Sequence, residues 1–217
     1  MTHPINRRSF IQQATTGTAA LLAAPYVARS QNANSRLQVG FVAVGGRAGG
    51  HTQAMHEMGL QCVAFADVDK LKWEGVTTKA GWEQAAGYTD WREMFNRHGK
   101  ELDVIFVSTP DHSHYAPSMT AVSMGIHCYT EKPLTWSVRE AQLLSRAYAK
   151  NPNVVTQMGN QGHAGDGWRR AYDYVKAGAL GDIQEFHTWT NRPIWPQGGT
   201  RPDWSDPVPD HLDWESW

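Results

Sequence analysis

The chain has 217 residues, and its 20 lysine and arginine residues nearly balance its 21 aspartate and glutamate residues, giving a formal net charge of −1. This balance indicates neither a nucleic-acid partner nor an anionic membrane surface. No apolar run approaches the roughly 20 residues of a membrane-spanning helix, so we expect no stable membrane insertion.

The first thirty residues resemble a targeting segment. Arg7 and Arg8 precede a weakly apolar run that reaches about Ala24, and no acidic residue occurs before Glu57. Segment 1–30 resembles a twin-arginine export signal, which predicts a periplasmic protein exported in the folded state. The alternative is an amphipathic N-terminal helix of the mature fold.

A nucleotide-binding unit is predicted from residue 37 onward. The apolar, β-branched run 37–44 is typical of a buried parallel strand, and a glycine-rich turn at 45–50 follows it. A helix over 51–58 and a second strand over 60–66 come next, and this strand ends at Asp67. In such units the glycines let the backbone approach a pyrophosphate, while the acid accepts hydrogen bonds from a ribose.

The glycine fingerprint GxGxxG is imperfect in this chain. Its best alignment places Ala43, Gly45 and Ala48 at the three glycine positions, and alanine is unusual at the first. Asp67 lies 24 residues after Ala43, close to the spacing of about 20 that the fingerprint expects. The alternative for Asp67 is a solvent-exposed cap of the turn that follows.

Strands and helices continue to alternate beyond this unit. The pattern predicts strands over 103–109, 126–130 and 154–158, a helix over 116–124, and a helix that reaches Lys150 and opens with a capping box of Ser137 and Glu140. We therefore predict an α/β fold, a doubly wound parallel (Rossmann) sheet over 36–158 with its ligand at the carboxyl ends of the strands. A helix over 167–176 and a strand over 183–190 begin a second α/β domain, over 159–217.

Four motifs in order, VGGRAGGH, ADVD, TPDHSHY and TEKPL, resemble those of the Gfo/Idh/MocA family of NAD(P)-dependent oxidoreductases over residues 36–217. The resemblance implies a Rossmann domain followed by an α/β domain whose open sheet forms the substrate site. It implies NAD as cofactor and a small sugar or polyol as substrate, and it allows a homo-oligomer of the full-length protein. NADP is disfavoured because Asp67 would repel a 2′-phosphate.

The resemblance also assigns site residues. Lys132 of the EKP motif is the implied catalytic residue, which would orient a substrate hydroxyl, and its bond to Pro133 is cis in relatives. Asp67 belongs at the adenosine ribose, and Gly45, Gly46 and Arg47 belong along the pyrophosphate. The implied cofactor-binding residues are Ala43, Gly45, Gly46, Arg47, Asp67, Thr109, Pro110, His114 and Glu131, of which Thr109, Pro110 and His114 belong near the nicotinamide half.

Two pairs of polar residues have competing interpretations. His112 and His114 have the alternate spacing of metal ligands, but no third ligand of matching spacing is evident, so we expect no metal. Asn160 and His163 follow the sixth predicted strand and are candidate partners for substrate hydroxyls. The alternative is that they belong to a polar hinge between domains.

Cys62 and Cys128 are predicted on the second and fifth strands. In the strand order 3-2-1-4-5-6, three strand spacings of about 4.8 Å separate these strands by about 14 Å, beyond the reach of a disulfide. We therefore expect two buried thiols.

The favoured function is hydride transfer between NAD and a hydroxyl carbon of a sugar or cyclitol. One alternative is an NAD-dependent glycosidase that oxidises its substrate transiently, and another is a non-catalytic nucleotide-binding module. In the family, the catalytic base is an Asp and His pair beyond the Trp-rich loop that segment 191–217 resembles. We therefore expect the chain to end inside the C-terminal domain, and these 217 residues to bind NAD without dehydrogenase turnover.

Overall fold

The computed structural model describes residues 36–191, 199–200 and 205–217. The chain divides into two units, Met1–Leu37 and Gln38–Trp217, and every element below belongs to the second unit. The predicted export signal over 1–30 lies outside the described residues. Within the described part of the chain, no helix is both long and apolar enough to cross a bilayer.

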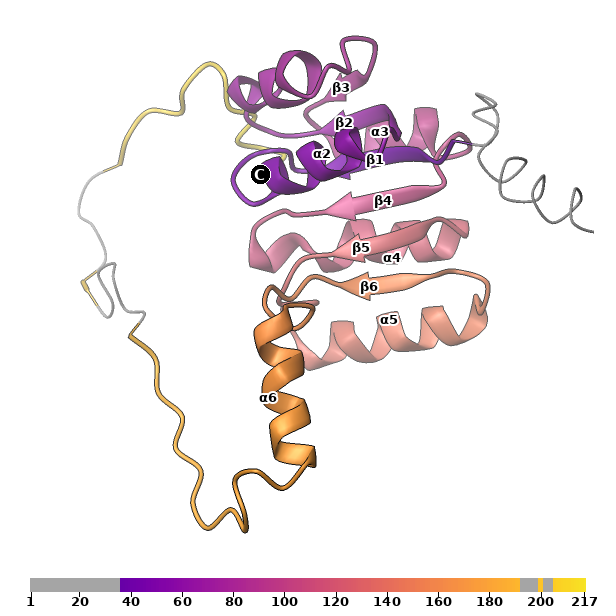
Figure 1. The fold of residues 1–217 in the computed structure, drawn as a ribbon. Helices are drawn as coiled ribbons and strands as arrows, with labels where there is room; N and C mark the ends of the chain where they lie inside the picture. Colours follow the sequence, from indigo (N-terminus) through magenta and orange to yellow (C-terminus); the bar gives the residue numbers. More distant parts are fainter. Residues whose placement is uncertain (1–35, 192–198, 201–204) are drawn as a thin grey trace, which may run out of the picture. The chain divides into compact units, whose positions relative to one another are not determined.

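A six-stranded parallel sheet forms the centre of the second unit (Figure 1). Its strand order is β3-β2-β1-β4-β5-β6, so the predicted doubly wound fold and its strand order are confirmed. The β3 strand is short and has no apolar run to mark it in the sequence. The strands are β1 (Gln38–Val42), β2 (Gln61–Ala66), β3 (Ala86–Tyr88), β4 (Val104–Val107), β5 (His127–Thr130) and β6 (Thr156–Met158).

The helices connect these strands or follow the sheet. They are α2 (Ala48–Glu57), α3 (Trp91–His98), α4 (Tyr115–Met124), α5 (Val138–Lys150) and α6 (Asp166–Lys176). Helix α5 begins as predicted, because Ser137 Oγ accepts from the Glu140 amide while the Glu140 carboxylate accepts from the Ser137 amide. Helix α3 begins where the side chain of Asp90 accepts a hydrogen bond from the Arg92 amide.

Apolar side chains cover both faces of the sheet. On one face, residues of α3, α4 and α5 such as Met94, Val122 and Leu144 pack against alternate strand residues. On the other face, Phe41 and Phe65 pack with α2 and with the segment that precedes β3. Burial on both faces explains the nearly continuous apolar runs of β1 and β4.

Cys62 and Cys128 are free and buried, as predicted. They lie in β2 and β5, with β1 and β4 between these strands. Burial raises the pKa of the Cys62 thiol to about 12 and also raises the pKa of Cys128. Both side chains therefore behave as small core residues.

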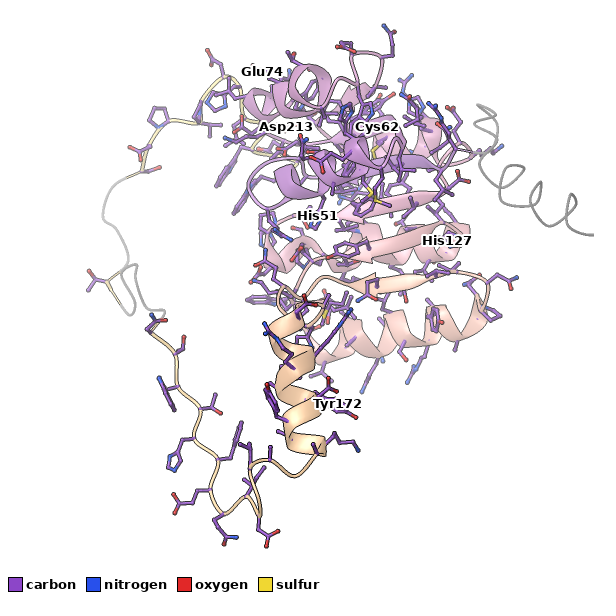
Figure 2. The ribbon with its side chains drawn as sticks, in the orientation of Figure 1. His51, Cys62, Glu74, His127, Tyr172 and Asp213 are labelled. Carbon is purple, nitrogen blue, oxygen red and sulfur yellow. The ribbon has the colours of Figure 1, made fainter. Side chains whose placement is uncertain are left out.

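The strand predicted over 183–190 is not present. This segment has no regular secondary structure, and Phe186 and Trp189 are 87% and 84% exposed. A strand requires a neighbour that pairs with its backbone, and none of the described strands pairs with this segment. The preceding helix α6 is amphipathic but has no buried residue, and Tyr172 projects from it into solvent (Figure 2).

The C-terminal segment returns to the sheet. Leu212 forms an antiparallel bridge with Asp69, in the loop that follows β2. The Lys70 amide donates to the carbonyl of His211 over 3.0 Å, and the Asp213 amide donates to the carbonyl of Val68 over 2.9 Å. Residues far apart in the sequence therefore meet at the carboxyl end of β2.

Candidate functional site

Two cavities lie at the carboxyl ends of the strands, where strand order reverses between β1 and β4. The first has a volume of about 410 Å³ and the second about 360 Å³. Arg47, Ser108 and Thr109 line both cavities, so the two are adjacent. Dinucleotides bind at this position in open α/β sheets, with one half on each side of the reversal.

The first cavity contains the glycine-rich turn. Of the predicted cofactor-binding residues, it is lined by Ala43, Gly45, Gly46, Arg47, Asp67, Thr109 and Pro110. Gly46 has a φ of +52°, and a Cβ there would meet no atom within 4 Å. The turn therefore presents an open backbone surface beside the N-terminus of α2, which suits a phosphate group.

Ala43 has the left-handed backbone conformation that glycine normally adopts. Its φ is +67°, and it is the only non-glycine residue with positive φ among the described residues. Ala43 occupies the first glycine position of the fingerprint, and its amide donates to the carbonyl of Ala66 over 2.7 Å. Glycine is preferred at this position because it adopts a left-handed backbone conformation without steric penalty. In this chain the turn forms although the residue is alanine.

The carboxylate of Asp67 is held by three backbone amides. Oδ2 accepts from Val44 over 2.8 Å and from Gly45 over 3.2 Å, while Oδ1 accepts from Asp69 over 2.9 Å. Asp67 thus fixes the glycine-rich turn as well as lining the first cavity. Each carboxylate oxygen has two acceptor sites, so Asp67 retains acceptor capacity for a ribose hydroxyl.

The second cavity brings the EKP motif together with the loop that follows β6. Its walls include Thr109, His114, Glu131, Lys132 and Asn160, all five of them predicted site residues. The peptide bond between Lys132 and Pro133 is cis, as the resemblance implies. These residues combine a cation, a carboxylate and an amide in one cavity, which suits a polyhydroxylated ligand.

Glu131 is buried and contacts two basic residues, the buried His51 and the half-exposed Arg47. Its Oε1 lies 2.8 Å from Nε2 of His51 and 3.3 Å from Nε of Arg47. Burial acts to raise the pKa of Glu131, but hydrogen bonds from His51 and Arg47 outweigh it and hold the pKa below its ordinary value. Glu131 is therefore ionised and fixed in position at neutral pH.

His51 was not among the sequence-predicted site residues. It lies on α2, packs against Phe106 and Tyr129, and is 8% exposed. Figure 2 shows His51 near the carboxyl ends of the strands and His127 near their amino ends. The sequence gives no signal for the contact with Glu131, because the two residues are 80 positions apart.

His114 is buried between two loops. Its Nε2 lies 2.7 Å from the carbonyl oxygen of Thr109, and its Nδ1 contacts the carbonyl oxygen of Pro133. His114 thus links the loop after β4 to the EKP motif, and it also lines the second cavity. Through this link, the backbone conformations of the two loops depend on each other.

His163 and His112 do not join this group. His163 lines neither cavity and packs against Trp168 of α6, so the structure does not place it with Asn160 as predicted. His112 is exposed and packs against Trp217. No group of three or more potential metal-ligating residues occurs in the described part of the chain.

Two buried hydroxyls indicate that the cavities accommodate a polar ligand. Ser108 Oγ and Thr109 Oγ1 have no hydrogen-bond partner, and both residues line both cavities. Buried polar atoms are normally paired, so unpaired hydroxyls at a cavity wall point to a polar ligand. Together with the glycine-rich turn and Asp67, they fit a dinucleotide.

Comparisons with known proteins agree with this geometry. An α-N-acetylgalactosaminidase from Shewanella oneidensis is 29% identical over 184 residues, which cover 70% of this chain and 39% of that protein. The structure of myo-inositol 2-dehydrogenase from Lactobacillus plantarum is similar with a TM-score of 0.60 at 24% identity, covering 69% of this chain and 43% of that chain.

A second solved structure is scyllo-inositol dehydrogenase from Lactobacillus casei with bound NAD(H) and scyllo-inositol. It is similar with a TM-score of 0.59 at 22% identity, covering 69% of this chain and 43% of that chain. The chain thus spans about two fifths of the length of these known proteins.

A family model described as the oxidoreductase family with an NAD-binding Rossmann fold matches residues 37–159. This match covers more than half of the chain and includes the glycine-rich turn, Asp67 and the EKP motif. The chain therefore belongs to the Gfo/Idh/MocA family of oxidoreductases, and its matched domain is an NAD-binding Rossmann domain.

Proposed function

We propose that this chain provides the cofactor-binding part of an exported oxidoreductase that transfers hydride between NAD and a hydroxyl carbon of a sugar or cyclitol. The main support is the position of Lys132. It lines the second cavity, which adjoins the cavity of the glycine-rich turn at the reversal of strand order. A substrate held beside Lys132 would thus lie next to the cofactor site.

The residues of this chain would bind and orient both molecules. Bound NAD supplies the hydride acceptor. The open backbone at Gly46 and the cation of Arg47 favour a pyrophosphate, while Asp67 favours an unphosphorylated ribose and hence NAD over NADP. The ammonium group of Lys132 would donate a hydrogen bond to the reacting hydroxyl and stabilise the negative charge that develops on its oxygen.

The network around Glu131 supports this arrangement. Glu131 keeps a negative charge next to Lys132, and the second cavity is lined by the acidic residues Glu131 and Asp111 together with the basic residues Arg47 and Lys132. Its hydrogen bonds to His51 and Arg47 fix its side chain. The amide of Asn160 offers both a donor and an acceptor to other substrate hydroxyls.

A test of the proposed function uses the full-length protein that contains this chain. NADH formation would be measured against a panel of polyols and sugars, together with NAD affinity. Lys132→Ala should abolish turnover while NAD affinity stays within about twofold, because Lys132 acts on the substrate. Lys100→Ala, a change at an exposed lysine beyond α3, should alter neither. Turnover that survives Lys132→Ala would contradict the proposal.

A glycosidase that uses NAD without net turnover is the second candidate. It is favoured by the similarity to an α-N-acetylgalactosaminidase and to proteins named glycosyl hydrolase family 109. Release of the aglycone from a glycoside without accumulation of NADH would favour it over the dehydrogenase. Tight NAD binding without either reaction would favour a non-catalytic module.

The export signal and the extent of the protein also belong to this proposal. The pair Arg7 and Arg8 with its apolar run supports twin-arginine export to the periplasm. The remainder of the substrate domain, with its catalytic base, would lie in sequence outside these 217 residues, so this chain should bind NAD without steady turnover. Steady NADH production from a polyol by the 217-residue chain would refute this.

A further inference from the structure

The C-terminal segment 209–217 forms part of the wall of the first cavity. Leu212, Ser216 and Trp217 line this cavity together with Asp67 and the glycine-rich turn. This segment is predicted from sequence to belong to the substrate domain, with no cofactor contact. In the structure it lies beside Asp67 and the glycine-rich turn.

Specific contacts hold this segment in place. Two backbone hydrogen bonds join it to the loop after β2, and Nδ1 of His211 lies 2.9 Å from Oδ1 of Asp69. Asp213 accepts hydrogen bonds from Thr89 and Ser216, which lower its pKa. The segment is thus tied to the ends of both β2 and β3.

Trp217 presents an aromatic surface at this wall. Its ring is parallel to that of Trp214, with centroids 5.3 Å apart, and it also contacts His112 in the loop after β4. Trp217 nevertheless remains 51% exposed. An indole held by neighbours at a cavity wall can stack on a base at little cost in side-chain entropy.

The position of Trp217 indicates which half of the dinucleotide it would contact. Trp217 lines the cavity that contains Asp67, and the acid after β2 marks the adenosine ribose in such folds. Thr109 and Pro110 of the loop after β4 line the same cavity, but the hydrogen bonds that hold segment 209–217 go to the loop after β2 and to Thr89 after β3, on the Asp67 side. Trp217 does not line the second cavity, which contains Lys132. We infer that segment 209–217 is part of the cofactor site, and that Trp217 contacts the adenosine half of NAD. This inference rests on the proposed NAD binding.

Calorimetric titration of the 217-residue chain with NAD and with ADP-ribose tests this inference. Trp217→Ala should weaken binding of both ligands by the same factor, roughly tenfold, because both contain the adenosine half. Trp217→Phe should restore most of the affinity. Trp189→Ala is the matched control, since Trp189 is exposed and lines neither cavity.

Hydrogen exchange provides a second measurement that does not depend on a substitution. ADP-ribose should slow exchange of the Lys70 and Asp213 amides, which form the hydrogen bonds that hold the segment. Unchanged exchange at these amides with ligand bound would overturn the inference.

The possible titration results separate this inference from the proposed function. Equal affinities of wild type and Trp217→Ala would overturn the inference and leave NAD binding intact. Weaker binding of NAD alone, with ADP-ribose unaffected, would place Trp217 at the nicotinamide half and also overturn it. A wild-type chain that binds neither ligand would overturn both the inference and the proposed function.

Discussion

Nε2 of His51 lies 2.8 Å from Oε1 of Glu131, although 80 residues separate them in the sequence. Both side chains are buried, and Arg47 approaches the same carboxylate oxygen. Helix α2, which follows the glycine-rich turn, is thereby joined to the motif that carries Lys132. This contact connects the cofactor-binding turn to the proposed substrate site.

His51→Ala should lower the free energy of unfolding by about 2 kcal/mol, because a buried carboxylate loses a hydrogen bond. It should also weaken catalysis by the full-length protein, since Glu131 loses a fixed position next to Lys132. Urea denaturation measures the first effect. His56→Ala, on the same helix but exposed, is the control and should cost much less. Similar losses for the two variants would argue against the network.

Acid should destabilise the fold through Glu131. Its pKa is lowered in the folded state, so its contribution to stability is present above the ordinary value of 4.5 and is lost as the pH falls through the folded-state pKa. The pKa of Asp69 is also lowered in the folded state, so Asp69 loses its contribution to stability as well when the pH falls, over a lower pH range than Glu131.

Denaturation of wild type and Glu131→Gln across this pH range measures the contribution of Glu131. The variant should be less stable at neutral pH, and its stability should fall less steeply as the pH drops below 4.5. Parallel curves for the two proteins would show that Glu131 does not contribute.

Ala43→Gly should stabilise the protein. The left-handed backbone at Ala43 carries a penalty that glycine removes, partly offset by the greater freedom of glycine in the unfolded chain, so the net gain should be about 0.5–1 kcal/mol. Ala48→Gly, at the start of α2, should instead destabilise by a similar amount. A loss of stability in Ala43→Gly would contradict the strain at this position.

Asp67→Ser should lower the preference for NAD over NADP. Removing the carboxylate removes repulsion of a 2′-phosphate, and it also frees the amides of Val44 and Gly45. Both affinities should therefore fall, with the affinity for NAD falling more. Asp103→Ser is the control. Asp103 lies at the amino ends of the strands, away from the cavities, and its carboxylate likewise accepts a hydrogen bond from a backbone amide, that of Gln38. An unchanged affinity ratio in Asp67→Ser would refute the assignment.

Replacing Arg7 and Arg8 together with lysine should retain the protein in the cytoplasm, because the twin-arginine translocase recognises the arginine pair rather than its charge. Cell fractionation with immunodetection measures this. The matched control replaces Arg29 with lysine, which leaves the pair intact. Undiminished export of the double variant would contradict the export proposal.

The fold was predictable because periodicity and turn signals are local properties of the sequence. Buried parallel strands are continuous apolar runs, so β1, β2 and β4 are evident, and the capping box of Ser137 and Glu140 marks the start of α5. The β3 strand was missed because Ala86–Tyr88 is three residues long and contains a glycine. The prediction of a strand over 183–190 was wrong. A strand forms only where a neighbouring strand pairs with its backbone, and the local sequence pattern does not show whether such a neighbour is present.

The site was predictable where each residue stands in a motif at a strand end, as Asp67 and Lys132 do. His51 and the segment around Leu212 were not predictable, because their roles depend on contacts between residues 80 and 143 positions apart in the sequence. His163 is close to Asn160 in sequence but lines neither cavity, so its contact with substrate hydroxyls stays a prediction.

The residues that line the two cavities are spread along the chain from Val42 to Trp217. No short segment of the chain supplies all the residues of either cavity. Parallel neighbours such as β1 and β4 pair only after a long crossover closes, so we expect the cofactor site to form late in folding. A dinucleotide therefore binds the assembled sheet and not its partly folded precursors. At 100 times its dissociation constant, it would add about 2.7 kcal/mol to the unfolding free energy of the sheet as a whole.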